Sequence, residues 1–419
     1  MADITMVDEI RQSLRSQQCD EQRERRQKLV DDRRGASVST KELEPVPIEE
    51  FEAMLKDIKV QRNNKHYLRK VKNSLALGGD YISRFLRTNG ALEQLISVTL
   101  RSTESSCQLE ALACLTNLAC GDHKATNRVL RSAGPYLITF LNGSNPFLQE
   151  QSAWCLANIA RDCDECRELL KCQGASHAFV KALRSIYPQV VDMAVFALLA
   201  YAQSSSDIVQ DLVNRDLHEH LLPLFDRDSA KTDFIGQLGW IILCTYSHDS
   251  VPVENMNYSE RLCLAVLDKM IHYSLAPQEN SAALPSLLAC LATWSSGRCN
   301  LAAQLAGMPG IIAALGHLLE APHLHLRREA LWLMHCLSGF LTQHDLADIS
   351  AAISGIVPLL TPGAECINEV LQLLQGISTT LPAFRRSLAG SAAILAQLQQ
   401  MTPEHYGESV KLHAILTQP

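Results

Sequence analysis

A helical segment with a tryptophan and an asparagine four residues apart constrains the fold of this chain more than any other feature. Its clearest copy is Leu148-Gln-Glu-Gln-Ser-Ala-Trp154-Cys-Leu-Ala-Asn158-Ile-Ala-Arg-Asp162. Residues four positions apart share one face of an α-helix, so the indole and the amide are expected side by side. Such a pair suits an extended peptide, because the indole can wall a side-chain stem and the amide can bond to the backbone.

Six further variants of this segment follow a regular period. Aligned on the asparagine position, the copies are spaced by 41, 42, 44, 49, 43 and 40 residues. A period in the low forties with helical character is typical of armadillo and HEAT repeats, whose units stack to share one core. We therefore predict an all-α fold, a right-handed armadillo superhelix of about eight units. The aligned positions are Asn117, Asn158, Ala200, Cys244, Thr293, Cys336 and Gly376.

Glycines that precede apolar runs give a second marker of the repeat. Glycine adopts backbone conformations that other residues avoid, so each is expected at the turn between a short helix and a long buried one. The composition suits an aliphatic core, since 47% of the residues are hydrophobic and only 5% are aromatic. The marker glycines are Gly90, Gly134, Gly174, Gly310, Gly355 and Gly390.

The sequence favours the cytoplasm and the nucleus as compartments. It is polar and charged from Asp3 onward, which predicts no signal peptide. Its most apolar window, residues 301–319, contains Gln304 and His317 and is expected to be a buried helix pair, not a membrane span. The 14 cysteines mostly fall inside helical patterns, where cysteine behaves as a small apolar residue in a reducing compartment.

Charge is distributed unevenly along the chain. Residues 10–34 and 56–72 carry net charges of +3 and +6, whereas the chain from residue 73 onward carries −9. A basic N-terminal part and an acidic body suggest an acidic partner for the first and a basic partner for the second. For the basic part, a solvated helix is the alternative. With the polar, proline-bearing linker 35–47, we predict an N-terminal arm at 1–50 and an armadillo-repeat domain at 51–419.

The segment Trp154-Cys-Leu-Ala-Asn158-Ile-Ala resembles the Trp-x-Leu-x-Asn-Ile-Ala motif of the importin-α family of nuclear import adaptors. Asn117-Leu-Ala-Cys-Gly121 matches the same motif, with Ala113 at the tryptophan position. The resemblance runs from about residue 75 to the C-terminus and is concentrated in residues 105–165. It implies an armadillo superhelix whose concave groove holds nuclear localisation signals, and a basic N-terminal segment that binds importin-β.

The resemblance also implies a pocket for a lysine of the bound signal, formed by Gly121, Thr126 and Asp162. A carboxylate, a hydroxyl and a backbone carbonyl can accept the three hydrogen bonds of an ammonium group, and glycine lets a peptide approach the backbone. The alternative is that Asp162 merely occupies a helix-terminal loop. The other peptide-binding residues expected from the resemblance are Asn117, Glu150, Gln151, Trp154, Asn158, Trp240 and Trp332.

The asparagine pattern disappears from the later repeats, as in a divergent branch of the family. Trp240 and Trp332 remain, but Cys244 and Cys336 stand at the asparagine positions. Each lost backbone bond removes about 0.5–1.5 kcal/mol, so we expect one peptide site, not two. In the arm, the residues expected to bind importin-β are Arg23, Arg25, Arg26, Lys28, Arg33 and Arg34.

Patterns typical of enzymes, cofactor sites and metal sites are missing from the sequence. Cys163-Asp-Glu-Cys166 is a lone CxxC without a second ligand pair, and the histidines near residue 320 fit a solvated loop. No phosphate-binding glycine loop or nucleophile elbow occurs. We therefore expect no enzyme activity, no cofactor, no metal and no small-molecule substrate.

The basic run 56–72 could track the phosphates of a nucleic acid, but Leu55, Ile58 and Val60 interleave with it. A helix that caps the first repeat is the simpler interpretation, and no nucleic-acid or membrane partner is expected. The predicted partners are basic cargo segments and importin-β. The alternative function is an armadillo scaffold or chaperone-like protein that binds one dedicated partner outside transport.

Overall fold

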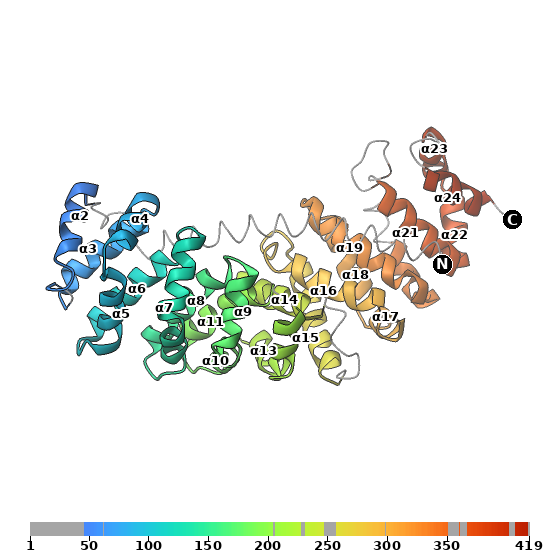
Figure 1. Ribbon diagram of the computed structural model, residues 1–419. Coiled ribbons are helices and arrows are strands. Elements are labelled where there is room, and N and C mark those ends of the chain that lie inside the picture. Colours follow the sequence, from blue (N-terminus) through green and yellow to red (C-terminus); the bar gives the residue numbers. More distant parts are fainter. Residues whose placement is uncertain are drawn as a thin grey trace. The chain divides into compact units, whose positions relative to one another are not determined.

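The computed structural model describes residues 46–61, 63–203, 206–227, 231–246, 257–297, 299–350, 360, 367–401 and 407–417 (Figure 1). These ranges contain α-helices, two 3-10 segments and no β-strand, which confirms the predicted all-α fold. No helix within them is both long and apolar enough to cross a membrane. Residues 1–45 of the predicted arm, with its arginines, lie outside the described residues, whereas residues 48–50 already belong to the first described helix.

The chain divides into two compact units, Met1–Leu137 and Ile138–Pro419. The boundary between them falls inside a helix, α7 (His123–Leu141). The other helices of the first unit are α2 (Ile48–Lys56), α3 (Lys65–Ala76), α4 (Gly79–Arg87), α5 (Ala91–Arg101) and α6 (Ser105–Leu118).

The second unit continues the alternation of short and long helices. Its first part holds α8 (Pro146–Ala160), α9 (Asp164–Cys172), α10 (Ala175–Ala182), α11 (Pro188–Tyr201), α12 (Ser206–Val213), α13 (Leu217–Phe225), α14 (Thr232–Tyr246) and α15 (Asn257–Ser274). Its second part holds α16 (Leu284–Gly297), α17 (Cys299–Ala306), α18 (Ile311–Leu319), α19 (Leu324–Leu337), η1 (Ser338–Phe340), η2 (Gln343–Asp345), α21 (Ile367–Thr380), α22 (Pro382–Ala389), α23 (Ala392–Gln400) and α24 (Gly407–Thr417).

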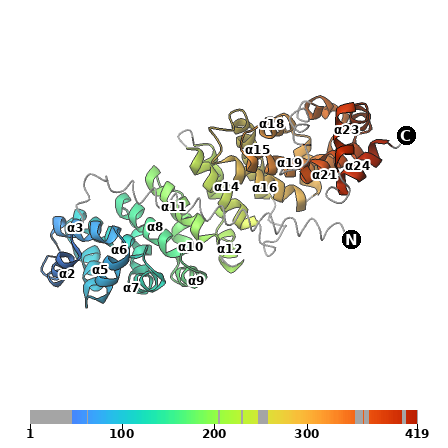
Figure 2. The same cartoon turned by 90° about the horizontal axis from the view of Figure 1, so that it is seen from above.

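The aligned asparagine positions all fall in helices of 14 or 15 residues, namely α6, α8, α11, α14, α16, α19 and α21, so the predicted repeat is confirmed. In the second unit, α8 packs on α11, α11 on α14, α14 on α16, α16 on α19 and α19 on α21 (Figure 2). Aliphatic side chains such as Leu156, Leu198 and Leu333 are fully buried there. Each long helix therefore packs against the next one in chain order, and we call each of these helices a rung.

Two glycines of α14 allow this helix to approach α16 closely. A Cβ atom at Gly236 would lie 2.5 Å from the Ala282 carbonyl oxygen, and one at Gly239 would collide with the Ser286 side chain. The Cys290 thiol of α16 donates to the Gly239 carbonyl oxygen at 3.2 Å. Side chains at these glycines would therefore force α14 and α16 apart.

The glycine turns are confirmed at Gly90, Gly174 and Gly310. Their φ angles of 78°, 92° and 84° lie in the left-handed region, and each immediately precedes a helix. Those helices have only 8 to 11 residues, so in these three repeats the long buried helix is the second helix after the glycine and not the first. The prediction is wrong at Gly134, which lies inside the continuous helix α7, and Gly355 lies outside the described residues.

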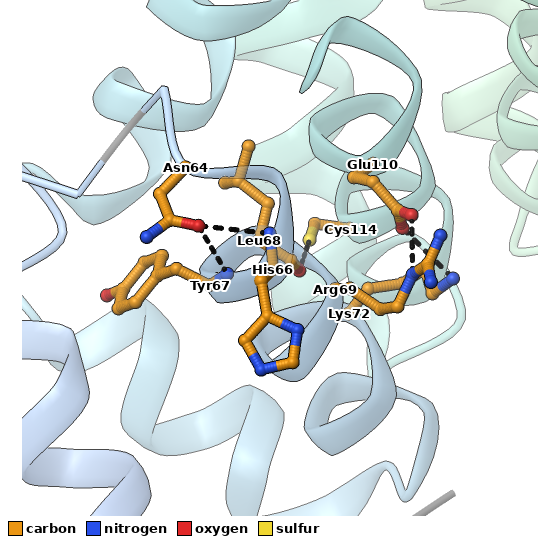
Figure 3. A network of polar contacts seen from close by, with 8 residues as sticks. All are labelled: Asn64, His66, Tyr67, Leu68, Arg69, Lys72, Glu110 and Cys114. Carbon is orange, nitrogen blue, oxygen red and sulfur yellow. Dashed lines mark hydrogen bonds and ion pairs between the residues drawn. The ribbon is translucent and has the colours of Figure 1, made fainter. Parts of the chain in front are cut away.

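Within the first unit, residues 65–72 of the basic run lie in α3, whereas residues 57–61 form turns and a bend after α2 (Figure 3). The Asn64 side chain caps α3 by accepting from the backbone amides of His66 and Tyr67. From α3, Arg69 and Lys72 reach the Glu110 carboxylate of α6 at 2.9 and 3.0 Å. These cations hold two neighbouring helices together, which agrees with the capping interpretation.

Candidate peptide-binding face of the long helices

We define the ladder face as the aligned tryptophan and asparagine positions on the long helices of the second unit, α8 to α21. Trp154 on α8, Trp240 on α14 and Trp332 on α19 are all partly exposed. The tryptophan position is Phe196 on α11 and Ala289 on α16, and both of these side chains are buried. Accessible indoles therefore recur on every second rung.

Local signals fix where α8 begins and ends, and so where Trp154 lies. The Asn145 side chain caps the helix by accepting from the amides of Phe147 and Leu148, and Pro146 occupies its first position. The helix ends at Ala160, after which the Asp162 amide donates to the Ile159 carbonyl oxygen at 3.1 Å. Trp154 therefore lies in the middle of this rung and Asp162 just beyond its end.

The indole of Trp154 combines an accessible side chain with a buried polar atom. Its Nε1 finds no hydrogen-bond acceptor among the described residues. Buried indole N–H groups usually have an acceptor, so this donor differs from those of most buried tryptophans. Asn158, one turn later, is only 4% exposed, so a ligand can reach no more than the edge of its amide.

Acidic and amide side chains lie on both sides of Trp154. Glu150 and Gln151, one turn earlier on α8, are partly exposed. The Asp162 carboxylate accepts a hydrogen bond from the Cys166 thiol at 3.5 Å, and burial raises the pKa of that thiol above its usual value. Different cationic side chains of a ligand could therefore approach a carboxylate on either side of Trp154.

In the first unit, the predicted site residues have clear structural roles. The Asn117 side-chain amide donates to the Lys72 carbonyl oxygen at 3.0 Å, which leaves its oxygen as the acceptor for a ligand. A Cβ atom at Gly121 would lie 2.8 Å from the Ala125 methyl group, so packing requires glycine there. Thr126 is 1% exposed and its hydroxyl donates to the Ala119 carbonyl oxygen at 3.2 Å.

The predicted lysine pocket combines residues from both units of the chain. Gly121 and Thr126 belong to the first unit and Asp162 to the second, so their convergence stays a prediction. The sequence analysis missed the contact between Asp162 and the CxxC pair. The contiguous string Asp162-Cys163-Asp-Glu-Cys166 was the signal that could have revealed it.

Sequence comparison links the chain to importin-α subunits over a short segment. No family model matches the chain. Importin subunit alpha-1b of Oryza sativa subsp. japonica is 30% identical over 95 residues, which are 22% of this chain and 18% of that protein. Importin subunit alpha-2 of Arabidopsis thaliana is 32% identical over 87 residues, 20% of this chain and 16% of that protein. The matches thus span less than a fifth of either relative's length.

Structural comparison supports the fold over most of the chain. The crystal structure of an engineered protein matches with a TM-score of 0.71 and 20% sequence identity, over 88% of this chain and 89% of that one. At this identity the likeness concerns the fold alone. Together with the three-helix repeat and its period in the low forties, it supports an armadillo-type solenoid. The chain therefore has an armadillo-type solenoid fold, and it is similar to importin-α subunits over about a fifth of its length.

Proposed function

We propose that this chain is a nuclear import adaptor that binds basic nuclear localisation signals along the ladder face, and importin-β through the arm at 1–50. The observation that carries the proposal is the α8 rung. It presents a partly exposed indole, Trp154, between the carboxylates of Glu150 and Asp162. Lysine and arginine side chains combine an apolar stem with a cationic end, and this rung offers a surface for both parts.

On the neighbouring helix α11, an arginine already pairs with the carboxylate that a ligand cation would approach. On α11, the Asp192 carboxylate is paired with Arg227 at 2.9 Å, and the Arg227 guanidinium lies over the Phe234 ring. A ligand cation would have to compete with that arginine for Asp192. The net charge of −9 from residue 73 onward favours a cationic ligand overall.

The spacing of the indoles sets the length of the peptide. Packed helices lie about 8–10 Å apart, so tryptophans on every second rung are separated by roughly 16–20 Å. An extended chain covers about 3.3–3.6 Å per residue, so about five or six residues separate the side chains that would contact Trp154 and Trp240. A peptide shorter than this would engage the α8 rung alone.

The alternative proposal is a scaffold for one dedicated protein partner. It is favoured by the later rungs, where Cys244, Thr293 and Cys336 stand at the asparagine positions and are partly exposed. Without the asparagine amides, these rungs lose the groups that would hold a peptide backbone of any sequence. A partner that depends on the later rungs would have to recognise them through its own side chains.

The test compares two charge reversals with the same change in net charge. Asp162→Lys places a cation at the end of the α8 rung, and Glu219→Lys places one at an exposed position of α13. For a fluorescent lysine-rich peptide, we expect Asp162→Lys to weaken binding by about 2 kcal/mol or more, roughly thirtyfold, and Glu219→Lys to have little effect. Equal affinities for the two variants would contradict the proposed site.

A pull-down separates transport from the scaffold alternative. The full chain and a chain lacking residues 1–45, which leaves α2 intact, are compared for retention of importin-β. Transport predicts that importin-β is retained only by the full chain. A scaffold predicts that a cellular partner is retained by wild type and by Asp162→Lys alike, and that importin-β is absent from both.

A further inference from the structure

Three metal-ligating side chains of the second unit meet at the junction of α8 and α9. The carboxylate of Asp162 and the thiols of Cys163 and Cys166 offer ligand atoms that all lie within 4.8 Å of one another. The Cys166 Sγ is 3.5 Å from the Asp162 Oδ2. The sequence analysis regarded the CxxC as isolated, whereas the fold places a carboxylate beside it.

The spacing of these donors fits a tetrahedral zinc ion. With Zn–S bonds of about 2.3 Å and Zn–O bonds of about 2.0–2.2 Å, neighbouring ligand atoms in a tetrahedron are about 3.5–3.8 Å apart. The distance between Cys166 Sγ and Asp162 Oδ2 already falls in this range. Thiolates favour Zn²⁺ over Mg²⁺ and Ca²⁺, which prefer oxygen ligands. Three donors leave one tetrahedral position for water or another donor.

Hydrogen bonds hold the three candidate ligand residues in place before any metal ion binds. Cys163 is the N-terminal cap of α9, and its Sγ accepts the Cys166 backbone amide at 3.4 Å. The Arg167 guanidinium donates to the Ala160 carbonyl oxygen at 2.7 Å, and it pairs with Asp164 at 2.5 Å. These bonds join the end of α8 to the start of α9. Little reorganisation is therefore needed to bind a metal.

The two cysteines differ in accessibility in a way that suits metal entry. Cys166 is 1% exposed and sits at the base of the cluster, whereas Cys163 is partly exposed. An ion can therefore enter from solvent past Cys163 and Asp162. The buried thiol would then replace one of its water ligands.

We propose that Asp162, Cys163 and Cys166 form a Zn²⁺ site. This site has a consequence for peptide binding, which rests on the function proposed above, because Asp162 is also the carboxylate assigned to the peptide lysine. An oxygen bound to zinc is a poorer acceptor for an ammonium group, and the cation repels the lysine charge. Zinc occupancy thus weakens binding of a basic peptide, which makes the adaptor site responsive to zinc.

Cobalt spectroscopy on the full chain tests the metal site directly. The protein is kept reduced with a phosphine so that a disulfide cannot form, and Co²⁺ is titrated and then displaced by Zn²⁺. Thiolate coordination gives a charge-transfer absorption, and tetrahedral geometry gives strong visible bands. The variant is Cys163→Ser, and the matched control is Cys172→Ser, an exposed cysteine on the same helix.

We expect wild type and Cys172→Ser to show the cobalt signal and to bind Zn²⁺ with equal affinity. Loss of one metal ligand in Cys163→Ser should weaken Zn²⁺ binding more than about a hundredfold. This is more than the effect of removing a residue that only hydrogen-bonds to a metal ligand. Asp162→Asn should weaken binding without abolishing the charge-transfer band, because both thiolates remain. Identical titrations of wild type and Cys163→Ser would overturn the site.

The competition is measured by titrating a fluorescent lysine-rich peptide with and without saturating Zn²⁺. We expect Zn²⁺ to weaken the peptide affinity of wild type at least about tenfold, a coupling within the usual range, and to leave Cys163→Ser unchanged. If zinc binds but the peptide affinity stays constant, the coupling is wrong and the metal site stands. If the metal-free protein binds no peptide, the proposed function fails independently of the cobalt result.

Discussion

The substitution Gly236→Ala tests whether the close approach of α14 and α16 organises the ladder face. The added methyl group would lie 2.5 Å from the Ala282 carbonyl oxygen and 3.3 Å from the Ala283 Cα atom. Both are backbone atoms, so no side-chain rotation can relieve the contact. Trp240 lies one turn further along α14, so a shift of this helix also displaces an indole of the ladder face.

Two opposing contributions determine the expected change in the free energy of unfolding of Gly236→Ala. Alanine is about 1 kcal/mol more favourable than glycine inside a helix, which stabilises the variant. Overpacking a rigid site costs typically about 1–3 kcal/mol, and a backbone clash belongs at the upper end. We therefore expect a net loss of about 1–2 kcal/mol, which corresponds to a decrease in Tm of roughly 2–8 °C.

Thermal unfolding followed by circular dichroism measures the effect, with Gly307→Ala as the control. Gly307 follows α17, and a Cβ atom there would meet only carbonyl oxygens at 3.6 and 3.7 Å, an ordinary contact. Gly307→Ala should leave Tm unchanged or raise it slightly, because alanine restricts the unfolded chain. If Gly236→Ala is as stable as Gly307→Ala, the close packing of α14 on α16 is refuted.

Two further predictions concern polar groups inside the units. Glu110→Gln keeps a hydrogen-bond acceptor but removes the charge that holds Arg69 and Lys72. We expect the free energy of unfolding to fall by about 1 kcal/mol, which is low for a charged pair because the Arg69 side chain is 49% exposed. Hydrogen exchange in α3 should become faster. Unchanged exchange there would show that the ion pairs contribute nothing. Burial lowers the pKa of His218 from 6.5 to about 4. The unfolded chain therefore binds a proton that the folded chain excludes, so stability should fall as the pH decreases from 6.5 to about 4. Urea unfolding across this range should show a weaker pH dependence in His218→Gln, and equal slopes would contradict the assignment.

The repeat was predictable because it depends on local chemistry that recurs. Alignment on Asn158 placed every later copy inside a long helix, even where Cys244 or Gly376 replaced the asparagine. The periodic apolar face around these positions fixes the helix, and the identity of one polar residue does not. The all-α repeat architecture therefore followed from the spacing together with the apolar pattern.

The glycine turns were only partly predictable. Gly90, Gly174 and Gly310 adopt left-handed backbone conformations, but Gly134 stands before a similar apolar run and lies within α7. Glycine permits a turn without requiring one, because its φ angle is equally compatible with a helix. The neighbouring helices decide between the two, and their packing is not visible in a local sequence window.

Side-chain contacts were the least predictable part of the structure. Glu110 pairs with cations of α3 about forty residues earlier, and the reason for glycine at position 121 is the Ala125 methyl group and the Ile82 side chain. The sequence analysis explained Gly121 by the approach of a peptide, whereas the packing already excludes a larger side chain there. Likewise, the contact between Asp162 and Cys166 depends on the conformation of the short turn that joins α8 to α9.

A crystal structure of the full chain with a lysine-rich peptide tests the central claim most directly. We expect an extended peptide along the ladder face, with one lysine Nζ within hydrogen-bonding distance of the Asp162 carboxylate and its stem against Trp154. A peptide bound away from the long helices, or with no cationic side chain at Asp162, would contradict the account.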